Sequence, residues 1–499
     1  MRGTIDAIRR WVELPSHRWI VGGLTLSVIV LTHLLTLRIS PTVWQDEVQI
    51  VDLGRGTLWP SEKAWSLSWT PAQRPVTFVN YLGVTIQELA YRLAAPSSVG
   101  PRVSTLAGAV LSAVLAYAWL RRRRTPRPLA WSLGVLLLLD PLFVASYRGA
   151  RVDSWVLACM FAACLLVRRG AEPDRSIARH MSGAAVLAVI AFFVWPSAFY
   201  LYPLLVAEFI EVAPTRTAAA LARWLRPAAI AGSLALLLCV APLWSQRGAV
   251  WADLFVSKNA YLPGTFVGRI LENLLALPAT FGISPIFPIL AVVAAILRYR
   301  SYLVAAAVVA LLSMLPTQIY GHRVLFLLPY FVGLVGDGYQ EMSVRWSGPA
   351  GARLRQTCLG LAMAWAVALS LIGRSANAWS QREERDPERL ITAAEVTLGH
   401  AQRRVYLGPW ELYYAGRFLG WEMFREYGTF SSAEWRTLLG HVDSAILGPQ
   451  VPAEFAAHLA AAGLERSAEL RVGQQPTKRA RLGASPYGTY LVYSRRPTR

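Results

Sequence analysis

The sequence predicts an α-helical polytopic membrane protein that carries a small α/β domain at its C-terminal end. Hydrophobic residues make up 55% of the 499 residues and charged residues only 16%. Apolar runs of the ~20-residue length that crosses a bilayer recur as far as residue 373. Arginines cluster at alternate ends of these runs, which is typical of short cytoplasmic loops. A large soluble helical protein would show polar faces at helical spacing inside the runs, and these runs show none.

The first apolar run is expected to be an uncleaved membrane span, because no small-residue cleavage site follows it. Arg9, Arg10 and Arg18 precede it and hold the N-terminus in the cytoplasm. Counting crossings from there predicts about eleven transmembrane helices, which places the C-terminus outside. The expected spans are 19–37, 102–120, 129–147, 154–168, 181–196, 198–213, 227–244, 281–297, 301–315, 324–337 and 356–373.

Two domains follow from the change in composition after residue 373. Residues 1–373 are expected to form the transmembrane domain, with a long first outer loop at 38–101. In that loop, residues 76–93 are apolar on one side and predict a helix lying on the membrane surface. Residues 374–499 are expected to form a soluble α/β domain on the outer side, because short β-like runs alternate there with helical stretches. The β-like runs are 404–407, 444–447 and 489–493.

The net charge of +20 belongs to the loops and does not indicate a nucleic-acid partner. No basic-aromatic module accompanies the charge, and arginines at span ends face anionic lipid headgroups instead. The four cysteines fall inside apolar runs, where a free cysteine behaves as a small hydrophobe. The histidines have no partner at metal-ligand spacing, and no Walker-type or G-x-S-x-G motif occurs. The sequence therefore predicts no metal centre, no ATP-driven transporter and no serine hydrolase.

An acidic pair, Asp46-Glu47, stands just outside the first span. Two adjacent acids at a membrane boundary can act as a general base or bind a divalent cation. Partial burial raises the pKa of a carboxylate, whereas a neighbouring arginine lowers it. The alternative is an ordinary solvated loop or a helix cap. Asp52 and Arg55 follow within the same polar stretch.

The second outer loop is short and carries Arg148, Arg151 and Asp153. Ionisable groups between two spans are costly when they face lipid, so they indicate a protected site. Guanidinium forks suit bidentate binding of phosphate. The alternative is an Arg–Asp pair that braces a tight turn. Asp140, before Pro141, is expected to cap a helix or to pair internally.

A third polar segment, residues 318–323, ends in His322-Arg323 and precedes Leu328-Pro329. Its position next to an expected span end places the arginine at the outer surface. There it can hold a lipid-linked phosphate, or it can simply sit at the interface as most such arginines do.

These features resemble the GT-C membrane glycosyltransferases, and most closely the group of protein O-mannosyltransferases and lipid A aminoarabinose transferases. The likeness rests on the Asp46-Glu47 pair opening a long first loop, on the Arg/Asp second loop, and on the late His-Arg…Leu-Pro segment, and its layout covers residues 15–340. It implies transfer of a sugar from a polyprenyl-phosphate carrier to a glycan, lipid or protein acceptor at the outer face of a bacterial inner membrane. Inversion by single displacement is part of that expectation. Dependence on a divalent cation stays open, because Asp46-Glu47 can bind a cation as well as accept a proton.

The resemblance also assigns roles to positions of this chain. Asp46 is expected to act at the acceptor hydroxyl, with Glu47 beside it and Asp153 as the second-loop acid. The remaining assignments are Arg148, Arg151, Arg323, His322 and Lys63 for the donor phosphate, and Arg55 and Arg74 for the acceptor.

Two rival functions were weighed. An O-antigen ligase or polymerase using diphosphate-linked glycans usually places its long functional loop late in the chain, whereas the longest loop between spans here is the first. A non-enzymatic carrier or lipid flippase would need ionisable residues near mid-span and helices broken by paired Gly/Pro. Residues 192–203, with two prolines, are the best candidate for such a break.

An aromatic-rich stretch in the C-terminal domain has two readings. It can stack on sugar rings, or it can form the core beneath a small sheet, and the sequence favours the core. The residues are Trp410, Tyr413, Tyr414, Trp421 and Phe424.

Overall fold

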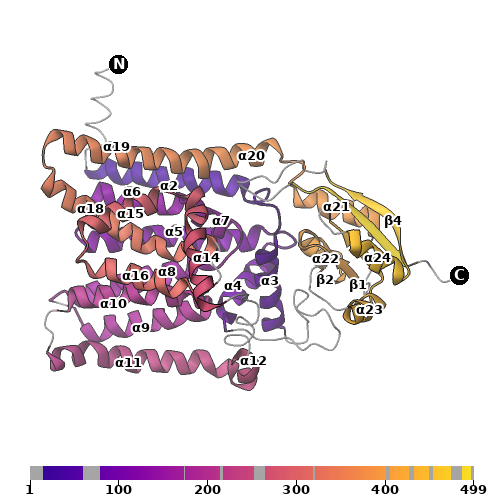
Figure 1. Cartoon of the computed structure of the whole chain (residues 1–499), viewed down its shortest axis with the longest axis horizontal. Coiled ribbons are helices and arrows are strands. Elements are labelled where there is room, and N and C mark those ends of the chain that lie inside the picture. The colour runs from indigo at the N-terminus through magenta and orange to yellow at the C-terminus, as the bar shows by residue number, and fades with distance from the viewer. Residues whose placement is uncertain are drawn as a thin grey trace, which may run out of the picture.

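The computed structural model consists of a helical bundle with a small sheet domain at one end (Figure 1). Lys63, Arg74 and residues 318–320 lie outside the described residues, so the roles predicted for the two basic residues stay predictions. The structure describes residues 15–59, 79–173, 175–213, 217–251, 265–317, 321–399, 405–425, 432–448, 453–473 and 486–495.

Each of the eleven expected spans coincides largely with a helix of the bundle. The long helices are α2 (Pro15–Leu37), α5 (Val99–Arg122), α6 (Arg127–Leu139), α8 (Asp153–Gly170), α9 (Ile177–Val194), α10 (Tyr202–Val212), α11 (Ala218–Val240), α15 (Ile286–Leu297), α16 (Tyr302–Met314), α18 (Leu328–Arg345) and α19 (Pro349–Ala366). The bundle is completed by the shorter α7 (Pro141–Arg148), α12 (Arg247–Trp251), α17 (Gly321–Val324) and α20 (Arg374–Ser380), by α14 (Phe266–Thr280), and by one-turn segments at Pro196–Leu201, Ala241–Gln246, Phe281–Ile283 and Leu325–Leu327.

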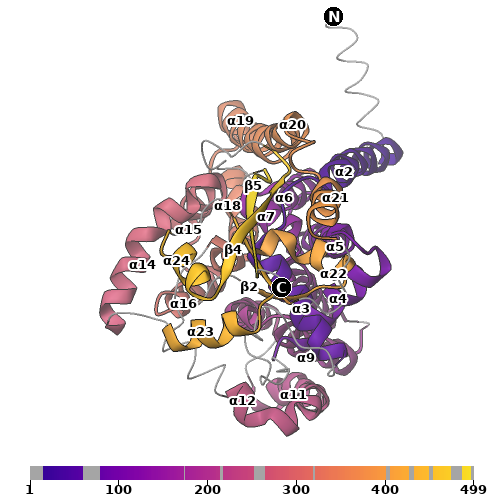
Figure 2. The ribbon, with the colours of Figure 1, turned by 90° about the vertical axis from the view of Figure 1, so that its right-hand side faces the viewer.

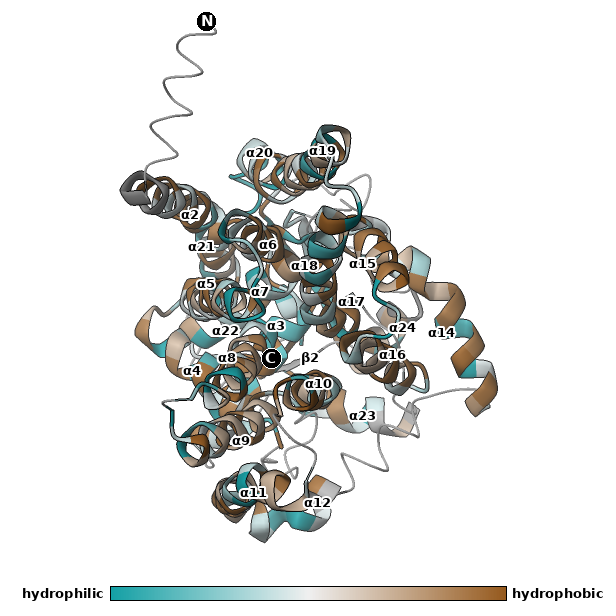
Figure 3. Cartoon of the chain, turned by 90° about the vertical axis from the view of Figure 1, so that its left-hand side faces the viewer, coloured by the Kyte–Doolittle hydropathy of each residue, from teal (hydrophilic) through white to brown (hydrophobic). Residues whose placement is uncertain are grey.

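Several of these helices have the length and hydropathy of membrane spans. Within the described residues, five segments pass that test, and a sixth is added if the pair α6 and α7, bent by 53°, counts as one span. α15 and α16 are apolar but shorter. Large apolar side chains are exposed, as on α11, where Leu237 and Leu238 are two-thirds exposed. Figure 3 shows that hydrophobic residues predominate along many helices of the bundle. Such a surface is typical of a membrane protein, and the count of eleven crossings stays a prediction.

The bend between α6 and α7 is capped by Asp140. Its carboxylate accepts hydrogen bonds from the backbone N–H groups of Leu142 and Phe143 at 2.9 and 3.3 Å, and Pro141 takes the first helical position. Proline is tolerated there because that position has no intrahelical donor to lose. The expected capping role of Asp140 is confirmed. The consequence is that α7 ends at Arg148, directly before the polar second loop.

Two helices of the first outer loop, α3 (Gln45–Leu58) and α4 (Tyr81–Leu93), pack into the bundle. A Cβ on Gly54 would lie 2.1 Å from the carbonyl oxygen of Val84, so only glycine permits this crossing of α3 over α4. The sequence predicted a helix on the membrane surface for this region. One side of α4 packs against α3, α5 and α9 and buries Gln87 and Glu88, whereas Leu89 and Leu93 are exposed, so the position at the membrane surface stays a prediction. Its polar residues serve contacts inside the protein.

The C-terminal part forms a five-stranded sheet, and the predicted β-like runs are confirmed as strands. The strand order is β2-β1-β3-β5-β4, with β1 parallel to β2 and β3 and with β5 antiparallel to β3 and β4. The helix that begins as α19 continues through a π-helical turn, Val367–Gly373, and ends with α20, past the expected boundary at 373. The elements are α21 (Pro387–Leu398), β1 (Val405–Gly408), a single turn Trp410–Leu412, α22 (Tyr413–Phe418), β2 (Glu422–Arg425), α23 (Ser432–Gly440), β3 (Ser444–Leu447), α24 (Ala453–Ala461), β4 (Leu464–Arg471) and β5 (Thr489–Arg495).

The C-terminal domain covers the end of the bundle at which α3 and α4 lie (Figure 2). Its apolar core continues into these helices, since Val48, Val51 and Tyr91 belong to the same buried cluster as Trp421. Arg38, after α2, holds Asp386 with two hydrogen bonds of 2.6 and 2.7 Å. Four of the five predicted aromatic residues are buried, which confirms that they form a core: Trp410, Tyr413, Tyr414 and Trp421. The domain and the first-loop helices therefore share one packing unit.

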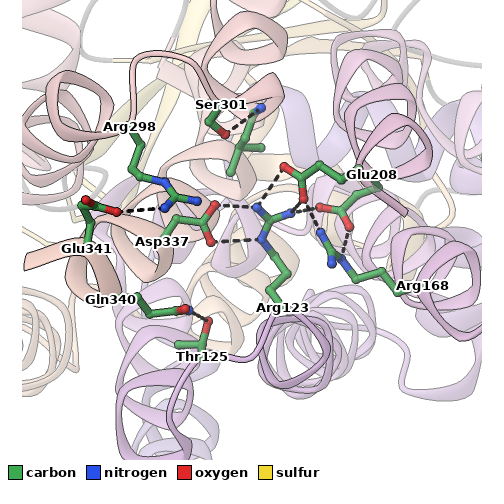
Figure 4. A network of polar contacts seen from close by, with 11 residues as sticks. Arg123, Thr125, Arg168, Glu208, Arg298, Ser301, Asp337, Gln340 and Glu341 are labelled. Atoms are coloured by element: carbon green, nitrogen blue, oxygen red, sulfur yellow. Dashed lines mark hydrogen bonds and ion pairs between the residues drawn. The ribbon is translucent and has the colours of Figure 1, made fainter. Parts of the chain in front are cut away.

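An ion-pair network around Arg123 lies at the opposite end of the bundle, where it lines a pocket of about 610 Å³ (Figure 4). Its guanidinium binds Glu208, Glu211 and Asp337, and all three of its nitrogens donate hydrogen bonds. Arg168 shares Glu208 and Glu211. The network joins the ends of α5, α8 and α10 to α18. We refer to these five residues as the inner centre.

Candidate functional site

Asp46 lies in the first turn of α3, and its carboxylate forms an ion pair with Nη1 of Arg151. The Asp46 side chain is 24% exposed, whereas Arg151 is 3% and Asp153 0% exposed. Of these three side chains, Asp46 is the one that solvent or a substrate reaches. The first and second motifs of the sequence therefore meet in space, and we refer to these three residues as the outer centre.

Arg151 is the hub of the outer centre. Its Nε donates to Oδ2 of Asp153 at 2.8 Å, and the Ser146 hydroxyl donates to the same oxygen at 2.7 Å. The guanidinium also lies over the ring of Trp195, 5.3 Å from its centroid. Within the described parts of the chain, Nη2 of Arg151 and Oδ1 of Asp153 are buried and lack a hydrogen-bond partner. Such unsatisfied groups are rare in protein interiors and call for an explanation.

The backbone of the second loop sets the direction of Arg151. Ala150 adopts φ 53°, a left-handed conformation that costs energy for a residue with a side chain. Its carbonyl accepts a hydrogen bond from the Gln87 amide of α4, and the Gly149 carbonyl accepts one of 3.2 Å from the Trp44 indole. A Cβ on Gly149 would lie 2.7 Å from the Trp44 ring nitrogen. The loop is therefore held between the start of α3 and the middle of α4.

The electrostatics link the third motif to this site. Burial, together with the positive charges of Arg151 and Arg323, lowers the pKa of His322 to about 2. Burial lowers the pKa of Arg151, but the charges of Asp153 and Asp46 outweigh it and raise that pKa above its usual value. His322 is thus neutral and Arg151 charged near pH 7. Since both arginines act on His322, the short helix α17 contributes to the same charged region.

Glu47 is placed differently from Asp46. Its carboxylate is fully buried, and this burial raises its pKa. It accepts a 2.7 Å hydrogen bond from Nη2 of Arg102 and a 3.1 Å hydrogen bond from the Tyr414 hydroxyl. Both of these hydrogen-bond donors to Glu47 are side chains of the protein itself. The two acids of the pair therefore divide, one toward solvent and one toward the interior.

Arg148, predicted to bind phosphate, also lies in the interior. Its guanidinium donates to the carbonyl oxygens of Ser40 and Thr36 and contacts Nδ1 of His33 at 2.9 Å. It is 1% exposed. These contacts tie the end of α7 to the end of α2, so the geometry gives Arg148 a role in holding the second loop.

Arg55, predicted to bind acceptor, is not brought to Asp46. It is buried in the last turn of α3 and pairs with Asp52 at 3.5 Å. Nine residues of helix separate it from Asp46, which is about 13 Å along the axis at 1.5 Å per residue. Across the described ranges, no three His, Cys, Asp or Glu side chains gather in a way that could hold a metal ion.

Sequence reasoning missed Arg102 and Tyr414, the partners of Glu47. Arg102 stands in the first turn of an expected span, and an ionisable residue at that position needs a partner inside the protein. The position of Arg102 therefore indicated a buried acidic partner, but it did not indicate that this partner is Glu47. Tyr414 carries no comparable signal, because its contact with Glu47 joins residues 367 positions apart.

No family model and no curated protein sequence matches this chain. Solved structures do match. ArnT from Cupriavidus metallidurans superposes with a TM-score of 0.61 in the apo state and 0.64 when bound to undecaprenyl phosphate, each at 12% identity over 96% of this chain and 98% of that one. The mycobacterial arabinofuranosyltransferase AftD superposes with a TM-score of 0.56 at 16% identity, over 96% of this chain and 40% of AftD.

The chain has the GT-C fold. The match runs through both the bundle and the C-terminal domain, since almost the whole length of ArnT is covered. The resemblance predicted from the Asp-Glu pair and the two Arg-bearing loops is confirmed at the level of fold. Figure 1 shows the apolar helices as one bundle, with the small sheet domain at one end of it. A shared fold does not by itself establish the substrate or the acceptor.

Proposed function

We propose that the chain is a membrane glycosyltransferase that moves a sugar from a polyprenyl-phosphate carrier to an acceptor hydroxyl on the outer face of the membrane. The observation that carries the proposal is the part-exposed Asp46 carboxylate held by the buried Arg151. The GT-C fold shared with ArnT, which has been seen bound to undecaprenyl phosphate, supports the class of donor. The carrier's tail would stay in the lipid while its phosphosugar reaches the end of the bundle.

The reaction is a single displacement. Asp46 accepts the proton of the acceptor hydroxyl, the hydroxyl oxygen forms a bond to the anomeric carbon, and the bond from that carbon to the phosphate oxygen breaks. The electron pair leaves with the polyprenyl phosphate, and the configuration at the anomeric carbon inverts. Phosphate is a good leaving group, so positioning and charge stabilisation suffice.

Arg151 and Arg323, with the neutral His322, form the proposed donor-phosphate group. The Nη2 of Arg151 has no partner among the described residues, and a phosphate oxygen is a natural acceptor for it. Negative charge grows on the leaving phosphate in the transition state, where a fixed guanidinium stabilises it most. Asp153 holds Arg151 from the other side and does not itself touch the acceptor.

The remaining predicted residues receive supporting roles in this proposal. Glu47 and Arg148 fix the ends of α3 and α7, and Lys63 and Arg74 stay predicted donor and acceptor contacts. The N-terminus lies in the cytoplasm and the C-terminal domain outside. This orientation puts the outer centre where a lipid-linked sugar and an envelope acceptor meet.

The test is Asp46→Asn in the full-length protein, reconstituted in lipid nanodiscs with a labelled undecaprenyl-phosphate sugar. We expect turnover to fall by about 10²–10⁴-fold, the usual contribution of a general base, with the thermal unfolding midpoint unchanged. Glu388→Gln is the matched control, because Glu388 is also an exposed acid paired with an arginine, Arg38 at 2.8 Å. Wild-type turnover in folded Asp46→Asn would reject the base assignment. Transfer from a diphosphate-linked glycan alone would instead support the ligase reading.

A further inference from the structure

We infer that Tyr414, on the C-terminal domain, is a positioning residue for transfer: it locks Glu47 and thereby sets the direction of Asp46. The inference rests on the proposed function, and it assigns the C-terminal domain a part in the reaction. Three observations support it: the contacts of Glu47, the place of Glu47 beside Asp46 on α3, and the rigid seat of Tyr414.

The first observation is that two other elements, α5 and α22, converge on the Glu47 carboxylate. Arg102 of α5 donates to both carboxylate oxygens, at 3.2 and 2.7 Å, and Tyr414 of α22 donates to Oε1 at 3.1 Å. The remaining nitrogen of Arg102 donates to the Leu37 carbonyl at the end of α2, at 2.8 Å. Glu47 and Arg102 are completely buried and Tyr414 is 1% exposed. The carboxylate therefore has one orientation.

The second observation is that Glu47 directly follows Asp46 in the first turn of α3. Successive side chains on a helix diverge by about 100°, so an immobilised Glu47 leaves Asp46 facing away from it, toward Arg151. The first turn is also the weakest part of any helix, because its N–H groups have no intrahelical partner. Glu47 is the third residue of α3, so holding its side chain fixes this turn.

The third observation is that Tyr414 is itself held in place. Its ring stacks on Tyr91 of α4 with centroids 5.4 Å apart, and the Tyr413 ring meets it edge-on at 5.2 Å. Arg417, one turn further along α22, lies over Tyr91 and forms an ion pair with Glu88 at 2.7 Å. These contacts hold the Tyr414 side chain in place, so its hydroxyl meets Glu47 in a fixed position.

Tyr413 provides a matched control. It is buried on the same helix, and its hydroxyl donates to Asp52 of α3 at 3.3 Å. Asp52 lies six residues after Asp46, about 9 Å along the helix. Tyr413→Phe and Tyr414→Phe each remove one buried hydroxyl at the same domain contact, so they should lower the thermal midpoint by similar amounts. Only Tyr414→Phe releases the turn that carries Asp46.

The experiment compares both variants as full-length protein in nanodiscs, measuring kcat, the KM for the lipid donor, and hydrogen exchange of residues 48–51. We expect Tyr414→Phe to lower kcat about tenfold with the donor KM unchanged, because a displacement of 1 Å costs up to about 100-fold. Exchange should accelerate at Val48, whose amide makes the first hydrogen bond of the helix. Tyr413→Phe should stay within about twofold of wild type.

Equal kcat in the two variants, or unchanged exchange at 48–51 in Tyr414→Phe, would overturn the inference. The exchange measurement does not depend on activity. It therefore tests whether Tyr414 holds the first turn of α3 even if Asp46→Asn remains active and Asp46 is not the base. Loss of activity in Asp46→Asn together with wild-type behaviour of Tyr414→Phe would keep the proposed function and reject the positioning role.

Discussion

The inner and outer centres are both built on a buried arginine surrounded by acids, yet they differ in how completely they are satisfied. In the inner centre every nitrogen of Arg123 donates a hydrogen bond, to three carboxylates from two helices. In the outer centre Nη2 of Arg151 and Oδ1 of Asp153 lack partners within the described residues, and Asp46 is part-exposed. The comparison separates an arginine whose nitrogens are all paired, although its network lines a pocket of about 610 Å³, from one that keeps a buried nitrogen without a partner in the described part of the chain.

Energetics explain why this difference is informative. A fully paired buried network is close to neutral for stability once formed, but breaking it is costly. A buried polar atom without a partner costs about 1–3 kcal/mol. A chain retains such a cost where a ligand later relieves it. The inner centre therefore joins helices, and the outer centre is the place where chemistry is expected.

The same substitution at both hubs tests this separation and has the largest expected effects. Arg151→Lys keeps the positive charge but loses the two-pronged guanidinium group. We expect the rate of transfer to fall about 100-fold, which is the usual effect of removing one hydrogen-bond donor that stabilises the transition state. Arg123→Lys should leave turnover per folded molecule within about threefold and lower the free energy of unfolding by about 3 kcal/mol, because two charge-assisted hydrogen bonds are lost. Turnover and thermal unfolding in nanodiscs check both.

Equal effects of the two substitutions would contradict the comparison. If the two variants lose activity equally while remaining folded, the inner centre takes part in catalysis or in a motion coupled to it. If Arg151→Lys loses only stability, the outer centre is structural too, and the proposed donor-phosphate group must be sought elsewhere.

A smaller effect is expected from Gly54→Ala, which tests whether the outer centre depends on close backbone packing. The added Cβ would lie 2.1 Å from the Val84 carbonyl oxygen, so α3 and α4 must separate. Overpacking of this kind costs about 1–3 kcal/mol, and we expect a lower thermal midpoint with reduced transfer. Gly23→Ala on α2 is the control, since nothing lies within 4 Å of its new Cβ. Equal midpoints for the two variants would show that the α3–α4 crossing can relax.

The smallest effect concerns pH. The folded-state pKa of His322 is about 2 and that of an unfolded histidine about 6.5. Below pH 6.5 the unfolded chain binds a proton that the folded one excludes, so the stability due to neutral His322 is lost as pH falls from 6.5 toward 2. Between pH 7 and 5.5, wild type should lose about 1 kcal/mol more than His322→Gln. Parallel pH profiles of the thermal midpoint would show that His322 can be protonated in the fold.

The sequence predicted the helical bundle, the strands of the C-terminal domain and the GT-C resemblance because these depend on long apolar runs and on short local patterns. It also predicted that Asp46 and Arg151 matter, since charged residues beside spans are costly and rarely incidental. The family resemblance gave the acceptor role to Asp46, but the residues themselves did not show where Glu47 lies. Adjacent acids look alike in sequence, and only the packing of α5 and α22 shows that Glu47 is enclosed.

Other differences have the same origin in long-range packing. Arg148 looked like a phosphate ligand because it precedes Arg151, but its hydrogen bonds go to the end of α2, more than 100 positions away. The burial of α4 depends on glycines in neighbouring helices, which a helical-face pattern does not reveal. Local pattern locates the polar segments, and tertiary contacts decide which of their residues face a substrate.

Helix α5 joins the two ends of the molecule in one rod. Arg102 near its start belongs to the Glu47 lock, and Arg123 at its end is the hub of the inner centre. The two positions are about 31 Å apart along the helix, close to the ~30 Å thickness of the hydrocarbon core of a bilayer. In a bilayer with longer or shorter acyl chains this length would no longer match, and the bundle would have to tilt or the lipid to deform around it.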